Sequence, residues 1–154
     1  MPKPVFIITA QGISEDHDSR LVTAFSIIEK IQVAVLKAGD SPEPRSRPSI
    51  PVNFGVNKTI AVWKRTPGDS GLFGHEFVIR FEDQERRANL TEFEFPPNAD
   101  LKRFMLTMQG FPVPKESGDV FVVSRIRKKG GEQWMSQEYP IAIEVITPES
   151  LSNS

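Results

Sequence analysis

The sequence predicts an all-β protein, an antiparallel β-sandwich of about eight or nine strands. Short segments in which apolar and polar residues alternate recur along the chain, and turn signals separate them. Near the end, two such segments flank Gly130-Gly131, a favoured hairpin turn. No long helix is predicted. A chain of 154 residues suits one domain, so we expect residues 1–154 to form a single sandwich.

The first two elements are predicted as strands. "VFIITA" (Val5–Ala10) is short, apolar and β-branched, which is typical of a buried strand. Residues 21–36 fit either a strand or a helix, and their β-branched content favours the strand. The strand reading puts five apolar residues on one face: Phe25, Ile27, Ile31, Val33 and Val35. The helix reading would use Leu21, Phe25, Ile28, Ile31 and Val35, with Gly39 as its end.

Residues 39–49 contain Pro42, Pro44 and Pro48 among Ser and Arg, which predicts a mobile surface loop because proline cannot donate ladder hydrogen bonds. Strands resume at "IPVNFGV" and "TIAVWKR", and "TPGDSGLFGH" is a turn-rich connection. We expect a short disordered tail at 148–154.

Three segments then alternate. In "EFVIRFE" we expect Phe77, Ile79 and Phe81 to face inward and Glu76, Arg80 and Glu82 to face outward. After "DQERRANL", interpreted as a connection, the inward residues are Phe93, Phe95, Phe104, Leu106 and Met108.

The last hairpin is the strongest signal. A two-residue turn at Gly130-Gly131, with both glycines at positive φ, sets which residues of the two strands lie opposite each other. On one face the opposed residues are apolar: Val120 lies opposite Ile141, Val122 opposite Tyr139, and Ile126 opposite Met135. The other face opposes Arg125 to Ser136 and Arg127 to Trp134. A slip of one residue would break this match, so turn chemistry and alternation support each other.

"PVFIITA", "FSIIEKI" and "GFPVPKESGDVFVVS" occur in an order that resembles a family of small uncharacterised bacterial all-β proteins, a domain of unknown function. The resemblance spans most of the chain and rests on structural motifs. It implies a C2-like or immunoglobulin-like sandwich and brings no catalytic residues.

Composition excludes several function classes. The chain has no cysteine, which excludes disulfides, thiol catalysis and thiolate zinc sites and fits a reducing compartment. The net charge of −1 gives no basic field for nucleic acid. No segment approaches the roughly 20 apolar residues of a membrane span, and no secretory signal is evident. We therefore expect a cytoplasmic protein that binds neither nucleic acid nor membrane.

The polar stretch "SEDHDSR" is the first candidate site. Asp16, His17 and Asp18 are the residues that a metal would use. Their acids are consecutive, without the alternating spacing or the bend-making glycine of a calcium loop, so we interpret the stretch as a polar connection. We expect no metal and no cofactor.

His75 is the other titratable candidate. "GDSGLFG" resembles the surroundings of a serine-protease nucleophile, but the chain is too short for that fold and contains no G-x-S-x-G. We interpret it as a glycine-rich turn with His75 at the edge of a strand. A hydrolase that uses His17 or His75 with nearby acids, and loop-end binding of calcium, sugar or lipid, stay open as alternatives.

The main hypothesis is a non-catalytic binding or assembly module. The outer face of the final hairpin carries apolar residues beside arginines, a pattern typical of interaction surfaces: Phe121, Val123, Arg125, Arg127 and Trp134. The competing interpretation is that a long loop covers this face. We expect it to contact another protein chain, most simply a second copy in a homodimer. The "RIRKKGG" tip is expected to be solvated, with protein or polyanion contact as alternatives.

Overall fold

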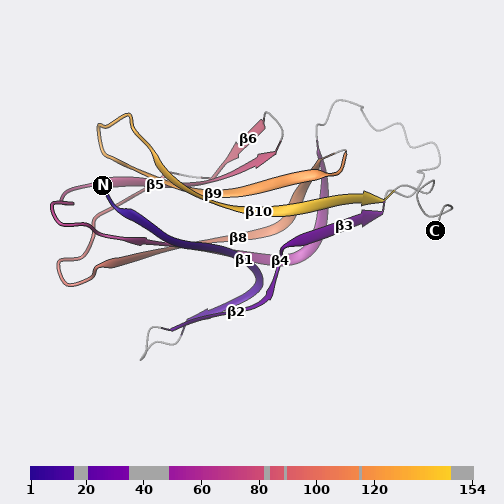
Figure 1. The fold of residues 1–154 in the computed structure, drawn as a ribbon, viewed down its shortest axis with the longest axis horizontal. Helices are drawn as coiled ribbons and strands as arrows, with labels where there is room; N and C mark the ends of the chain where they lie inside the picture. Colours follow the sequence, from indigo (N-terminus) through magenta and orange to yellow (C-terminus); the bar gives the residue numbers. More distant parts are fainter. Residues whose placement is uncertain (16–20, 35–48, 82–83, 89, 115, 147–154) are drawn as a thin grey trace.

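The structure is a computed structural model that describes residues 1–15, 21–34, 49–81, 84–88, 90–114 and 116–146, and these residues form ten strands and no helix. Four strands form one sheet in the order β2-β1-β4-β8. The other sheet has the order β3-β10-β9-β5-β6, and β7 also pairs with β5. Figure 1 shows the two layers. The strands are β1 (Lys3–Glu15), β2 (Val22–Ile27), β3 (Lys30–Ala34), β4 (Ser49–Lys64), β5 (Phe73–Phe81), β6 (Gln84–Arg87), β7 (Thr91–Phe93), β8 (Leu101–Pro114), β9 (Gly118–Lys128) and β10 (Met135–Ile146).

The predicted all-β sandwich is confirmed, and its C2-like or immunoglobulin-like type stays a prediction. Three details of the strands and their pairing differ from the prediction. "IPVNFGV" and "TIAVWKR" form one strand, β4, which has a bulge between Val52 and Val56. "DQERRANL", predicted as a connection, contributes β6, because its backbone pairs with β5 although its side chains do not alternate. One strand pair, β3 with β10, is parallel.

The prediction that residues 21–36 are extended is confirmed for the described part. The prediction that their apolar side chains share one face of a single strand was wrong. The segment contains two strands, with β2 in the first sheet and β3 in the second. Ser26 has a φ of 56°, and the Ile28 amide donates to the Thr9 carbonyl at 3.0 Å. Because the chain changes sheets here, Phe25 and Ile27 are exposed while Ile31 lies in the core.

The main core lies between the sheets. Every described residue predicted to face inward from the middle strands and the last hairpin belongs to it or packs against it. The largest fully buried side chain is Trp63 on β4, which faces β9 across the sandwich and donates from Nε1 to Ser124 Oγ at 3.0 Å. Alternation therefore predicted the correct side of these strands.

A second apolar cluster lies on the outer face of the four-stranded sheet. β1 pairs with β4 up to Ala10 and with β2 from Ala10 to Glu15, and Figure 1 shows it turning back beneath the sheet. Glu15 there forms an ion pair with Arg103 of β8, the far strand of the sheet. The second half of β1 with β2, here called the folded-back hairpin, covers the outer face. The cluster comprises Ala10, Ile13, Ile60 and Val62, with Ile8, Val22 and Ala24 packed on it.

The predicted register of the last hairpin is confirmed. Strand pairing opposes Val120 to Ile141, Val122 to Tyr139, Ile126 to Met135 and Arg125 to Ser136. The predicted turn was wrong by one residue: Gly130 has a φ of 78° but Gly131 has no positive φ, and the Gly131 amide donates to the Lys128 carbonyl at 2.9 Å. The Lys129 amide donates to the Leu72 carbonyl at 2.9 Å, so the tip is tied to the segment before β5.

Several predictions fall on residues that the structure does not describe. They concern Asp16, His17, Asp18, Glu82, the loop at 39–48 and the tail at 148–154. Ser49, predicted as the last loop residue, begins β4. Among the described residues, no helix has the length and apolar character that crossing a membrane requires.

Candidate functional site

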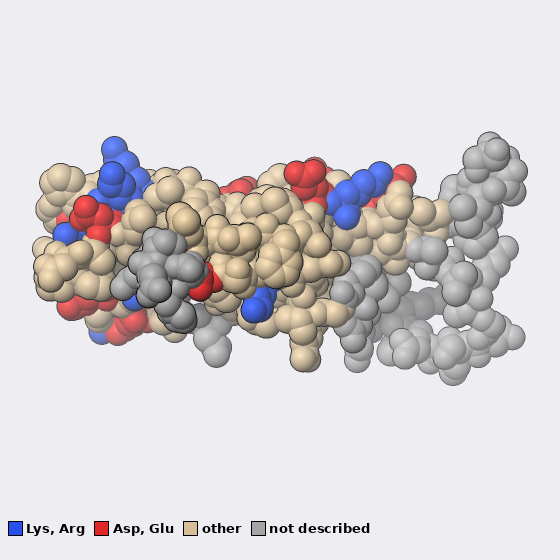
Figure 2. All heavy atoms as spheres, turned by 90° about the horizontal axis from the view of Figure 1, so that it is seen from below, with Lys and Arg blue, Asp and Glu red and all other residues tan. Residues whose placement is uncertain are grey.

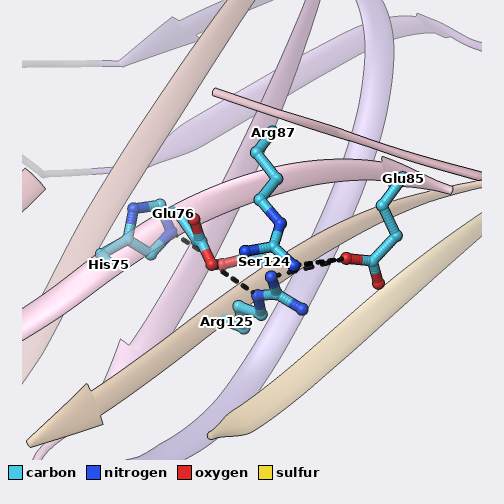
Figure 3. A network of polar contacts seen from close by, with 6 residues as sticks. All are labelled: His75, Glu76, Glu85, Arg87, Ser124 and Arg125. Carbon is cyan, nitrogen blue, oxygen red and sulfur yellow. Dashed lines mark hydrogen bonds and ion pairs between the residues drawn. The ribbon is translucent and has the colours of Figure 1, made fainter. Parts of the chain in front are cut away.

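One residue of the predicted interaction surface, Arg125, belongs to a group of ion pairs on the outer face of one sheet. Arg125 on β9 donates from Nε to Glu76 Oε1 on β5 at 2.7 Å and lies 3.6 Å from Glu85 on β6 (Figure 3). Arg80 on β5 pairs with Glu138 on β10 at 2.8 Å. These long side chains share the outer face of β5, β9 and β10.

The apolar residues of this face are less accessible than the sequence suggested. Val123 was predicted to be exposed, and this was wrong: it is 4% exposed, and its neighbour Val78 is 1% exposed. Phe121 is half-buried beside Arg80, whose guanidinium lies 5.0 Å from the ring centroid. Arg80 and Arg125 flank these valines on the same strands. The competing interpretation, cover by the proline-containing loop at 39–48, falls on residues that the structure does not describe.

The predicted contact between Arg127 and Trp134 is confirmed. The Arg127 guanidinium lies 4.6 Å from the Trp134 ring centroid, and that of Arg125 lies 5.0 Å from it. Each such contact contributes about 0.5–1 kcal/mol at an exposed site. Four of the five predicted surface residues, all except Val123, thus contact charged or aromatic side chains of their own chain.

Glu76 was predicted to face outward; it lies on the outer face but is only 6% exposed, because Arg125 covers it. Replacing Arg125 by Leu leaves this carboxylate without its closest partner. We expect Arg125→Leu to lower the free energy of unfolding by about 1–3 kcal/mol. The double variant Glu76→Leu/Arg125→Leu should recover most of the loss. Urea unfolding measures both, and a double variant as unstable as the sum of the two single variants would contradict the coupling.

His75 lies in the core rather than at the edge of a strand, which corrects its prediction. It is the third residue of β5 and only 3% exposed. Its ring stacks on Phe104 with centroids 3.6 Å apart and meets the edge of Phe77 at 4.7 Å. Nε2 lies 2.9 Å from Ser124 Oγ. Burial lowers the pKa of His75 from 6.5 to about 3, so the ring is neutral at pH 7.

The pair of Ser124 and His75 has the atoms of a nucleophile and a base, but not an open geometry. Ser124 is 0% exposed and already accepts the Trp63 indole N–H. Glu76, next to His75 in the chain, points to the opposite face of β5 and pairs with Arg125 (Figure 3). Within the described ranges, no carboxylate bonds to His75. This arrangement holds two sheets together rather than offering a reactive hydroxyl to a substrate.

No protein-family model, curated protein or solved structure matches the chain. The resemblance to the small bacterial all-β family therefore stays a prediction. The described residues also contain no group of three or more His, Asp or Glu side chains that could hold a metal ion. Asp69, in the turn before β5, instead accepts from the Thr66 amide at 2.9 Å and hydroxyl at 2.7 Å.

A pocket of about 320 Å³, which was not predicted from the sequence, lies between the two sheets where the chain passes from β2 to β3. Asn57 on β4 lines it and is 1% exposed. Asn57 has the same parity as Thr59, Ala61 and Trp63, whose side chains are all buried. A polar residue at an inward position was the one signal in the sequence that could have located this site.

Proposed function

We propose that this chain is a non-catalytic binding module that pairs with another protein chain, most simply a second copy, through the free edge of β2. A comparison of the strands at the sheet margins carries the proposal. In the part of the chain that the structure describes, β2 ends the first sheet and pairs with β1 alone. Its sequence, VTAFSI, contains neither a charged residue nor a proline.

The other marginal strands carry the residues that usually protect a sheet edge from further pairing. β3 has Lys30, β6 is QERR and β7 has Glu92. β8 has two basic residues near one end and two prolines near the other: Lys102, Arg103, Pro112 and Pro114. An unprotected edge of six residues is a ready template for a strand of a second chain.

Side chains on the exposed face of the folded-back hairpin add apolar surface beside this edge. Leu21 is 67% exposed, Phe25 55% and Ile27 48%. The Phe25 ring lies over Gly12, where a Cβ would come within 1.9 Å of the ring. Because Gly12 has no Cβ, the Phe25 ring packs against it and stays on the protein surface. Exposed apolar groups gathered in this way are typical of interaction sites.

The absence of charge favours a second copy as the partner. In a two-fold symmetric pair, the same strand meets itself in antiparallel orientation, so any charge on it would lie near its own copy. β2 carries none. Pairing of two β2 strands would join two four-stranded sheets into one eight-stranded sheet and satisfy edge amides on both chains.

Light scattering on wild-type and variant chains tests the proposal. We expect wild-type protein to have the mass of two chains, and Phe25→Asp and Ile27→Lys to have the mass of one. Phe121→Asp and Trp134→Ala serve as matched controls on the outer face of the last hairpin, and their mass should equal that of wild type. A wild-type mass of one chain would remove the proposal. A dimer that only the control variants disrupt would move the interface to the hairpin face.

One observation supports the non-catalytic part of the proposal, and the composition supports the location and the partner class. Ser124 Oγ is enclosed and bonded to Trp63 and His75, and it has no free approach for a substrate. The composition, without cysteine and with a net charge of −1, supports a cytoplasmic location and a protein partner rather than nucleic acid.

A further inference from the structure

We propose that the pocket beside Asn57 binds a small neutral molecule that presents a hydrogen-bond donor next to an acceptor, such as a carboxamide or a cyclic imide. The proposal is independent of the pairing of β2. It rests on an unsatisfied buried amide, on the space beside it and on the chemistry of the lining.

Asn57 is the anomaly. It is 1% exposed, and neither Nδ2 nor Oδ1 has a hydrogen-bond partner in the described structure. Native proteins satisfy nearly all buried polar atoms, and each exception needs a physical reason. By contrast, Thr9 and Thr59, on the same face of the sheet, bond to each other at 2.8 Å. The sheet thus pairs its other buried polar groups and leaves this amide open.

The space beside the amide suits a small ligand. The pocket of about 320 Å³ lies at the lower end of the range of roughly 300–1,000 Å³ for ligand sites. It lies where the chain passes from β2 in one sheet to β3 in the other. Its lining residues are Gln11, Ser26, Ile27, Ile28, Lys30, Ile31, Gln32 and Asn57.

The lining selects a neutral ligand. Among the described lining residues, Lys30 is the one that carries a charge. It is already paired with Glu144 at 2.6 Å, and Gln32 donates to the same carboxylate at 2.7 Å. Three isoleucines provide apolar walls. The remaining polar groups are side-chain amides and a hydroxyl, which carry no net charge. A charged ligand would therefore lose its hydration without gaining an unpaired counter-charge.

The geometry of an asparagine amide selects the functional group. The amide has two N–H donors and one carbonyl acceptor side by side in a plane. A ligand edge with one acceptor beside one donor satisfies both atoms at once, as when asparagine binds adenine through two parallel hydrogen bonds. Carboxamides, cyclic imides and nucleobases share such an edge.

The test uses ¹⁵N-labelled full-length protein and follows the Asn57 side-chain NH₂ resonances by NMR. The probes are nicotinamide and uracil, and the comparison compounds are benzoate, which lacks the donor, and glucose. We expect nicotinamide or uracil to shift the Asn57 resonances in a saturable way and benzoate to leave them unchanged. Repeating the titration on Phe25→Asp separates ligand binding from chain association.

Asn57→Leu is the decisive variant, with Asn98→Leu at an exposed position as its matched control. Leucine has a similar size and needs no hydrogen bonds, so we expect a melting temperature equal to or above that of wild type. Probe affinity, followed through backbone resonances around the pocket, should fall at least about tenfold in Asn57→Leu and stay unchanged in Asn98→Leu.

Three results would overturn the proposal. Saturable binding of glucose alone would replace the ligand class. Failure of every probe to shift the Asn57 resonances would remove the site. A clear drop in melting temperature of Asn57→Leu, with no probe binding, would show that Asn57 holds a buried water for structural reasons.

Discussion

Lowering the pH from 7 to 4 is expected to destabilise this protein strongly through one buried histidine. The folded state keeps His75 neutral down to a pKa of about 3, whereas the unfolded chain takes up the proton near pH 6.5. Between these values the unfolded state binds more protons, so the free energy of unfolding falls as the pH falls. The slope is about 1.4 kcal/mol per pH unit, and the full interval corresponds to about 5 kcal/mol.

The cause is the surroundings of the ring. His75 is stacked on Phe104 and bonded to Ser124, and burial penalises an imidazolium there. Lys102, Arg103 and Glu92 line a pocket beside His75, so charges of both signs lie there, and burial is the cause of the lowered pKa. This contribution is fully present above pH 6.5 and is lost as the pH falls toward 3.

The difference in unfolding free energy between wild type and a His75→Gln variant isolates this effect, because the carboxylates titrate equally in both proteins. Urea unfolding at several pH values should give a difference that shrinks steadily below pH 6.5. The His75 ring protons should show no NMR titration between pH 7 and 5. A flat difference curve, or a His75 titration near pH 6.5, would contradict the buried neutral histidine.

The second large effect is expected from Ser124→Val. The Ser124 hydroxyl accepts the Trp63 indole N–H at 3.0 Å and lies 2.9 Å from His75 Nε2. Valine has a similar shape and no hydrogen-bonding atom, so two buried polar groups on two strands lose their partner. At about 1–3 kcal/mol for each group, the expected loss of unfolding free energy is about 2–6 kcal/mol.

A second variant separates hydrogen bonding from packing. Trp63→Phe removes the indole N–H, so adding Ser124→Val to it should cost less than adding Ser124→Val to wild type. Equal costs in the two backgrounds, measured by urea unfolding, would show that the hydroxyl does not bridge the residues and that valine simply fits poorly.

Much of the fold could be predicted because alternation and turn chemistry are local. The register of the last hairpin followed from the apolar parity of two strands about the Gly130-Gly131 region, and the structure has the predicted pairs although the turn itself lies one residue earlier. The change of sheet between Phe25 and Ile31 could not be predicted this way, because both residues keep the same parity. It depends on Ser26 and on the path of β1, which turns back after Ala10.

The site was harder to predict because it depends on contacts between distant strands. Val123 looks exposed in a single hairpin, but in the full sheet it lies beside the buried Val78 of β5 and is itself buried. Viewed from the side of the folded-back hairpin, charged side chains on the described surface are few and gather in separate groups among apolar and uncharged residues (Figure 2). Asn57 carries a signal in its parity, but its missing partners are visible only in three dimensions.

Hydrogen exchange at increasing protein concentration tests the central claim, pairing through β2, most directly. If two copies join along this edge, the outward-facing amides of Val22–Ile27 gain partners in the dimer. Their exchange should slow as concentration rises, and Phe25→Asp should abolish this dependence while β9 and β10 exchange as before. Exchange in β2 that does not change with concentration, or protection that appears on β9 and β10 instead, would contradict the account.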